Sequence, residues 1–451
     1  MNREEKLAKG KMLPLIFSMS LPAIVAQFIN LLYSIVDRIY IGHIPEIGSD
    51  ALAGIGLTSS IIILISAFAQ FVSGGGAPRA AIALGKGDRE QAEKILSNGF
   101  SMLIFFSVLC VSVTYAVKTP LLWLIGASED TVVYAEQYLN IYLIGTFFVQ
   151  ASVGLNTFIT AQGRSGIAMI SVLIGAIANI VLDPIFIFGL NMGVSGAALA
   201  TVISQGISAA WVLFFLFSPK ATLQIKPRFM IPDAAIIGSI LSLGIAPFVM
   251  ASTESFVGFV LNSGLQKYGG DIYVSALTVM QSAMQAVGVP LSGFIQGVTP
   301  IISYNYGAGN KKRIKEAIRI TFAVMTSFNL VMFLAMIIFP EAVASIFASD
   351  KELIATVGSI MPMFLAGMTI FGLQRSCQTA FVALGQAGTS LFIALLRKII
   401  LLIPLALILP NFIEPKVNGV FLSEPIADAT AAITCTVIFI FTFRRVMKKL
   451  P

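Results

Sequence analysis

The sequence predicts an all-α polytopic membrane protein with twelve transmembrane helices. Hydrophobic residues make up 57% of its 451 residues and charged residues only 11%, whereas a typical soluble domain is about 25% charged. The mean hydropathy is +0.90. The net charge of +7 does not indicate nucleic-acid binding, because the basic residues lie in short loops between long apolar runs.

Twelve apolar spans follow one another along the chain, separated by turn-forming residues, charged residues or both. Each is long enough for a bilayer, which needs about 20 apolar residues. Lipid offers no partner for an unpaired backbone group, so we expect each span to be a helix. In order, the spans are 14–40, 51–76, 95–117, 134–160, 166–188, 193–217, 235–262, 272–299, 315–339, 355–382, 387–409 and 418–443.

The first span follows several basic residues, as a cleaved signal peptide does. The span is too long for the apolar region of a signal peptide, and no convincing cleavage site follows it, so we keep it as the first transmembrane helix. Lys and Arg then predict the orientation. They gather in both terminal segments and in the loops after the even-numbered spans. The opposite loops hold only Lys118, Lys267, Lys351 and Lys416, which predicts cytoplasmic termini.

The second half of the chain repeats the first at a constant offset. The motifs Gly85-x-Gly87-Asp88 and Gly307-x-Gly309-Asn310 lie 222 residues apart, as do Pro78 and Pro300. We therefore expect two parallel six-helix lobes, at 1–217 and 235–451, joined by a cytoplasmic linker at 218–234. Transporters built from such repeats place their substrate between the halves near mid-membrane.

Four polar residues of the first lobe form a candidate binding site. Asp37 lies in the first span, Asn179 and Asp183 share one face of the fifth, and Thr201 lies in the sixth. A carboxylate within a membrane helix costs roughly 2.5–3.5 kcal/mol and is usually functional. These hard oxygen ligands suit a small cation such as Na⁺, or a proton shared by two acids. The alternative is a hydrogen-bonded polar knot that holds three helices together.

The second lobe offers a different set of charged residues. Glu254 lies in a polar stretch of the seventh span, but not at the position equivalent to Asp37, so we expect the lobes to share a scaffold and not a site. Arg375, in the tenth span, could pair with Glu254 or with another acid. Glu424 and Asp428 share one face of the last span, where a water-facing helix end and a cavity are both open interpretations.

Several classes of protein are disfavoured by what the sequence lacks. It has no GxxxxGK[ST] motif, so the chain is not itself an ATP-driven pump. It has no HExxH or GxSxG motif, which leaves an intramembrane enzyme without support. One histidine and three cysteines without CxxC spacing favour neither a metal centre nor a disulfide framework.

Several segments together resemble the multidrug and toxic compound extrusion (MATE) transporters, over essentially the whole chain. They are LYSIVDRIYIG at 32–42, ANIVLDP at 178–184 and the two repeated loop motifs. The resemblance implies a V-shaped bundle that exports organic, often cationic, compounds in exchange for H⁺ or Na⁺, with a role in antibiotic resistance. Family members bind the cation through an Asp, an Asn–Asp pair and a Thr, which Asp37, Asn179, Asp183 and Thr201 match.

The second lobe departs from one branch of that family. Na⁺-coupled NorM-like members add a Glu in the seventh helix and an Asp in the tenth. Glu254 matches the Glu, but the tenth span offers Gln374, Arg375 and Gln378 and no acid. This favours coupling through the first lobe and a MepA-like bacterial protein. We therefore expect a monomer in the lipid of the bacterial plasma (inner) membrane, without a cofactor other than the coupling ion.

The sequence analysis thus predicts a secondary active multidrug exporter. The alternative is a flippase for lipids or lipid-linked precursors from the same superfamily, a class that often carries a basic central cavity. The acidic intramembrane residues of the first lobe and the helix count of twelve favour the exporter.

Overall fold

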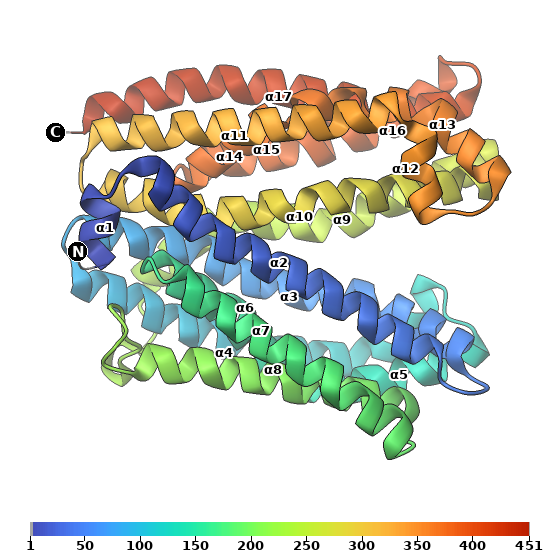
Figure 1. Cartoon of the computed structure of the whole chain (residues 1–451), viewed down its shortest axis with the longest axis horizontal. Coiled ribbons are helices and arrows are strands. Elements are labelled where there is room, and N and C mark those ends of the chain that lie inside the picture. The colour runs from blue at the N-terminus through green and yellow to red at the C-terminus, as the bar shows by residue number, and fades with distance from the viewer. Residues whose placement is uncertain (1–2, 451) are drawn as a thin grey trace.

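The computed structural model describes residues 3–450 and is almost entirely helical; the outermost residues of the two predicted lobes, 1–2 and 451, lie outside this range. Most helices run along the long axis of the molecule, in two groups (Figure 1). Helices α2–α8, blue to green, lie on one side, and α9–α17, yellow to red, lie on the other. Both ends of the chain lie at the same end of the bundle.

The first group begins with a short helix and continues through long, largely apolar ones. Residues 218–233, which include the 3₁₀ turn η2 (Pro227–Phe229), connect it to the second group. Its elements are α1 (Arg3–Lys9), α2 (Met12–Gly42), α3 (Gly48–Gly85), α4 (Arg89–Ile125), α5 (Glu129–Ile144), α6 (Thr146–Ala161), α7 (Ser165–Pro184), the π-helical segment η1 (Ile185–Gly189) and α8 (Gly193–Phe217).

The second group contains more breaks. Its elements are α9 (Ala234–Gly269), α10 (Asp271–Gly307), α11 (Lys311–Ile338), α12 (Pro340–Phe347), α13 (Lys351–Leu365), the 3₁₀ segment η3 (Ala366–Ile370), α14 (Phe371–Ala383), α15 (Ala387–Leu395), the π-helical segment η4 (Leu396–Leu402), α16 (Ile403–Ile408), the 3₁₀ turn η5 (Leu409–Asn411) and α17 (Lys416–Lys449).

The predicted number of membrane spans is confirmed. Within residues 3–450, eleven helical stretches are long and apolar enough to cross a membrane, and α5 with α6 make a twelfth that is bent by 60°. The bend lies at Gly145, where an added Cβ would overlap the side chain of Val202 on α8. The span predicted at 134–160 is therefore confirmed, and the structure adds a bend that depends on close packing against α8.

The repeat is visible in local geometry. Gly87 and Gly309 both adopt positive φ angles, of 79° and 69°, a conformation that glycine tolerates best. The next residues cap the following helices: Asp88 accepts a hydrogen bond from Gln91 N, and Asn310 accepts one from Arg313 N. Equivalent residues in the two halves therefore make equivalent turns.

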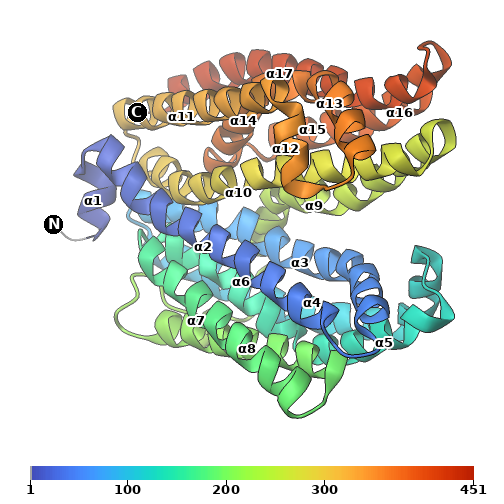
Figure 2. The same cartoon turned by 45° about the vertical axis from the view of Figure 1, so that its right-hand side comes forward.

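The two groups meet through glycines at the end that holds the termini. A Cβ on Gly85 (α3) would overlap the carbonyl oxygen of Tyr304 (α10), and one on Gly307 would overlap that of Ile82. Gly244 (α9) approaches the Phe71 carbonyl of α3 just as closely. Toward the opposite end the two groups diverge, as both views show (Figures 1 and 2). Close contacts between these glycines and carbonyl groups of the other group thus hold the two groups together at this end.

An arginine fastens α1 to the second group at the same end. Arg313, on α11, donates to the carbonyl oxygens of Leu7 at 3.0 Å and Gly10 at 2.8 Å, and to Asn305 Oδ1 at 2.9 Å. The last carbonyls of a helix have no partner within the helix, so a cation at this position stabilises α1.

We expect Gly244→Ala to destabilise the protein by about 1–3 kcal/mol, the usual effect of forcing extra volume into packed structure. The matched control is Gly238→Ala on the same helix, where a Cβ meets nothing within 4 Å; it should be neutral or stabilise by up to about 1 kcal/mol. Thermal unfolding of the two variants measures the difference. Equal melting temperatures would show that the close approach of α9 to α3 carries no energetic weight.

Candidate functional site

Three helices of the first group bring the predicted first-lobe residues together. Asp37 lies on α2, Asn179 and Asp183 on α7, and Thr201 on α8. Asn179 Nδ2 donates to Asp183 Oδ1 at 3.2 Å. The carboxyl groups of Asp37 and Asp183 are close enough to interact directly. Asn179 is 2% exposed and Asp183 is fully buried.

Three oxygen atoms of this cluster have no hydrogen-bond partner in the described chain. Asp37 Oδ1, Asn179 Oδ1 and Asp183 Oδ2 are buried and accept no hydrogen bond. Among the residues that the structure describes, neither acid forms a salt bridge; the exposed neighbour Arg38 acts electrostatically on Asp37 without pairing with it. Two adjacent buried carboxyl groups strongly favour a bound cation or proton. Three unpartnered hard oxygens also suit Na⁺ chemically.

Two tyrosines complete the surroundings of Asp37. Tyr138, on α5, shares a hydrogen bond with Thr201 and lies near Asp37. Tyr33 lies one helical turn before Asp37 on α2 and also faces it. The sequence analysis missed both. The four-residue spacing between Tyr33 and Asp37 could have identified the first, since such residues share a helix face. No sequence signal places Tyr138 there, because its position depends on the fold.

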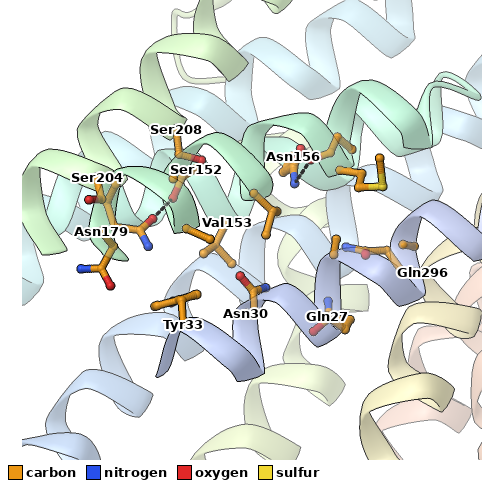
Figure 3. A pocket seen from close by; sticks show the side chains of 18 of the residues that line it. Gln27, Asn30, Tyr33, Ser152, Val153, Asn156, Asn179, Ser204, Ser208 and Gln296 are labelled. Carbon is orange, nitrogen blue, oxygen red and sulfur yellow. Dashed lines mark hydrogen bonds between the residues drawn. The ribbon is translucent and has the colours of Figure 1, made fainter. Parts of the chain in front are cut away.

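A cavity of about 240 Å³ lies beside this cluster. In Figure 3, Gln27, Asn30 and Tyr33 on α2 point toward Ser152 and Asn156 on α6, across the space from Asn179. No charged side chain lines it within the described part of the chain; the walls are serines, amides and apolar residues. Asn179 and Thr201 thus belong both to the cluster and to the wall of this uncharged cavity, whereas the two acids do not line it.

The backbone is irregular directly after the second acid. Pro184 has no N–H group and ends α7, and the π-helical segment η1 follows it. Such wide turns occur mostly at functional sites. Here the irregular turn follows directly after Asp183, within the group of helices that holds the site.

The second-lobe candidates form ion pairs that the sequence did not suggest. Glu254 pairs with Lys398, not with Arg375, at 2.7 Å between Oε2 and Nζ. Its side chain is 68% exposed, whereas that of Lys398 is 6% exposed. Arg375 forms no salt bridge with any residue in the range 3–450. Lys398 lies 144 residues after Glu254 in the chain, so sequence spacing could not reveal the pair.

A buried arginine forms salt bridges with both acids of the last helix. Arg397 Nη2 lies 3.0 Å from Glu424 Oε1, and Arg397 Nε also pairs with Asp428 Oδ1. Glu424 is 5% exposed and Asp428 is fully buried. Of the two interpretations left open for these acids, a water-facing helix end is therefore excluded. Arg397 and Lys398 are neighbours on the π-helical segment η4, and they serve different acids.

Comparisons with known proteins identify relatives of the whole chain. The family model described as MatE matches residues 22–185 and 247–408. "Multidrug export protein MepA" of Staphylococcus haemolyticus is 25% identical over 413 residues, which are 92% of this chain and 90% of that protein.

Two solved structures resemble the fold closely, each at 22% identity. "Crystal structure of MATE in the bent conformation" has a TM-score of 0.92 and covers 99% of both chains. "Outward-facing conformation of a multidrug resistance MATE family transporter of the MOP superfamily" has a TM-score of 0.89 and covers 98% of both. The likeness confirms the predicted V-shaped, twelve-helix architecture.

The charge network on η4 and α17 gives a stability prediction. Arg397→Met should destabilise the protein by about 3–5 kcal/mol, because it leaves Glu424 and Asp428 buried without a cation. Adding Glu424→Gln and Asp428→Asn should restore most of the loss, since neutral side chains need no counter-ion. Thermal unfolding in detergent compares the variants. If the triple variant were less stable than Arg397→Met alone, shape and not charge would account for the effect.

Proposed function

Because the chain belongs to the MatE family, we propose that it is a secondary active multidrug exporter. It moves organic, often cationic, compounds out of a bacterial cell in exchange for H⁺ or Na⁺. The observation that carries the proposal is the pair of neighbouring acids, the half-buried Asp37 and the buried Asp183, which lack a salt-bridge partner in the described chain.

The coupling ion binds at the first-lobe cluster. Asp37 and Asp183 supply the charge, and the Asn179 and Thr201 side chains supply neutral oxygens. A proton would be shared between the two carboxyl groups, whereas Na⁺ would use all four residues. Occupancy biases the lobes toward one arrangement, because the ion binds the two arrangements with different affinities. Export against a gradient requires that ion and compound be coupled energetically, not that they touch.

The relatives support export over the alternative of a lipid flippase. The Staphylococcus protein that matches over nearly its whole length is named a multidrug export protein. In the proposed arrangement the protein is a monomer in the plasma membrane. Its lobes are 1–217 and 235–451, with the linker 218–234 and both termini on the cytoplasmic side, where Lys and Arg gather.

Transport by purified protein in proteoliposomes tests this function. A Na⁺ gradient and a pH gradient, imposed separately, should each be tried for movement of a fluorescent cationic dye. One of them should drive the dye, and Asp37→Asn should reduce that movement at least tenfold, because the neutral amide cannot exchange a proton or hold a cation by charge.

The matched control is Asp50→Asn, which neutralises an exposed acid in the first turn of α3; it should leave dye movement unchanged. Absence of movement under both gradients, with dye binding unaltered by Asp37→Asn, would contradict the drug-antiport proposal. A lipid-scrambling assay would then be the next measurement.

The two acids should behave as one site. Because Asp37 and Asp183 act on the same ion, the double variant Asp37→Asn/Asp183→Asn should lose no more transport than the more impaired single variant. Initial rates of dye movement at a fixed gradient measure this. Losses that multiply in the double variant would indicate two independent ion sites.

A further inference from the structure

A second cavity lies between the two groups of helices, and unlike the first it has charged side chains in its wall. Its volume is about 450 Å³. The first group contributes residues of α3 and α6 to its walls, including Gln70 and Thr157, and the second contributes residues of α9, α10, α14, α15 and η4. It is therefore separate from the neutral cavity inside the first group, apart from Gln296, which lines both.

Three cations line this cavity: Arg375, Arg397 and Lys398. Among the residues that the structure describes, no carboxylate lines it. Two of these cations are paired with acids: Arg397 contacts the buried Glu424 and Asp428, and Lys398 contacts the exposed Glu254.

Arg375 is the one of these three cations that forms no salt bridge in the described chain. It has no salt bridge within residues 3–450, and its Nε atom is buried without a hydrogen-bond partner. Its guanidinium carbon lies 5.6 Å from the centre of the Phe371 ring, and that of Arg397 lies 4.4 Å from the same ring. An aromatic face orients a guanidinium group without neutralising it. Guanidinium groups bind carboxylates and phosphates with two parallel hydrogen bonds.

The rest of the wall is largely apolar. Pro247 and Met250 of α9, Ile295 of α10 and Val382 of α14 line it. A ligand that satisfies both parts of the cavity carries an anionic group on an apolar body. A simple inorganic anion would leave the apolar wall unfilled, and an organic cation would meet Arg375, whose charge is not paired in a salt bridge within residues 3–450.

We propose that this cavity binds amphiphilic organic anions through a carboxylate or phosphate group held by Arg375. This goes beyond the proposed exchange of cations, since it adds an anion-selective site between the lobes. The anionic group can belong to a free compound or to the headgroup of a lipid.

A pair of fluorescent probes tests the charge requirement. Dansylglycine carries a carboxylate, and dansylglycinamide has the same body without the charge. With the protein in nanodiscs of phosphatidylcholine and no ion gradient, dansylglycine should bind at least tenfold more tightly. Arg375→Gln should weaken dansylglycine binding about tenfold, the loss of one hydrogen bond to a charged group, and leave dansylglycinamide unchanged.

Arg319→Gln is the matched control, because it removes the same charge from an exposed position on α11. It should leave both affinities unchanged. Adding phosphatidylglycerol to the nanodiscs separates the two sources of the anion: competition with dansylglycine assigns the site to lipid headgroups, and its absence assigns it to free anions.

The proposal is overturned if the two probes bind equally to the native chain. It is also overturned if Arg375→Gln and Arg319→Gln weaken dansylglycine binding to the same extent. Because Arg375 makes no ion pair, its replacement leaves no acid unpaired, and the melting temperature of the variant checks that it is folded. The assay uses no gradient, so its outcome is independent of whether a cation drives export.

Discussion

The cost of an unpaired charge in hydrocarbon governs how the two lobes differ. In the second lobe, ion pairs between protein residues reduce that cost. Arg397 pairs with Glu424 and Asp428, and Lys398 pairs with Glu254. The first lobe does not, because Asp37 and Asp183 face one another without a salt bridge in the described chain. The acids Glu254, Glu424 and Asp428 of the second lobe are therefore paired with protein cations, whereas the two acids of the first lobe are not. In the proposed mechanism the coupling ion therefore acts on the first lobe.

The shared scaffold makes this asymmetry possible. Turns at Gly87 and Gly309 and the close contacts of Gly85 and Gly307 are built from backbone, so they do not depend on which charges a lobe carries. The cavities follow the same division, since the one inside the first lobe has no charged lining and the one between the lobes is basic. The two lobes can therefore carry different charged side chains while the backbone contacts between them stay the same.

Features set by local chemistry could be predicted from the sequence, and features set by packing could not. Apolar length predicted the spans, and four-residue spacing placed Asn179 and Asp183 on one face, where the structure also brings Asp37. The sequence did not reveal the bend at Gly145 or the approach of Tyr138 to Asp37. It also left open whether Arg375 pairs with Glu254 or with another acid, and it did not reveal that Glu254 pairs with Lys398. Each of these features depends on how helices from distant parts of the sequence pack against one another.

The hydrogen bonds from Arg313 to the end of α1 have a consequence for folding during biosynthesis. The carbonyls of Gly10 and Leu7 precede their partner by 303 and 306 residues. Chains are made from the N-terminus, and their early parts begin to fold first. The carbonyl groups at the end of α1 therefore gain their hydrogen bonds from Arg313 only after α11 has been synthesised and has docked. The last contacts of one of the first helices to be made are thus among the later ones to form.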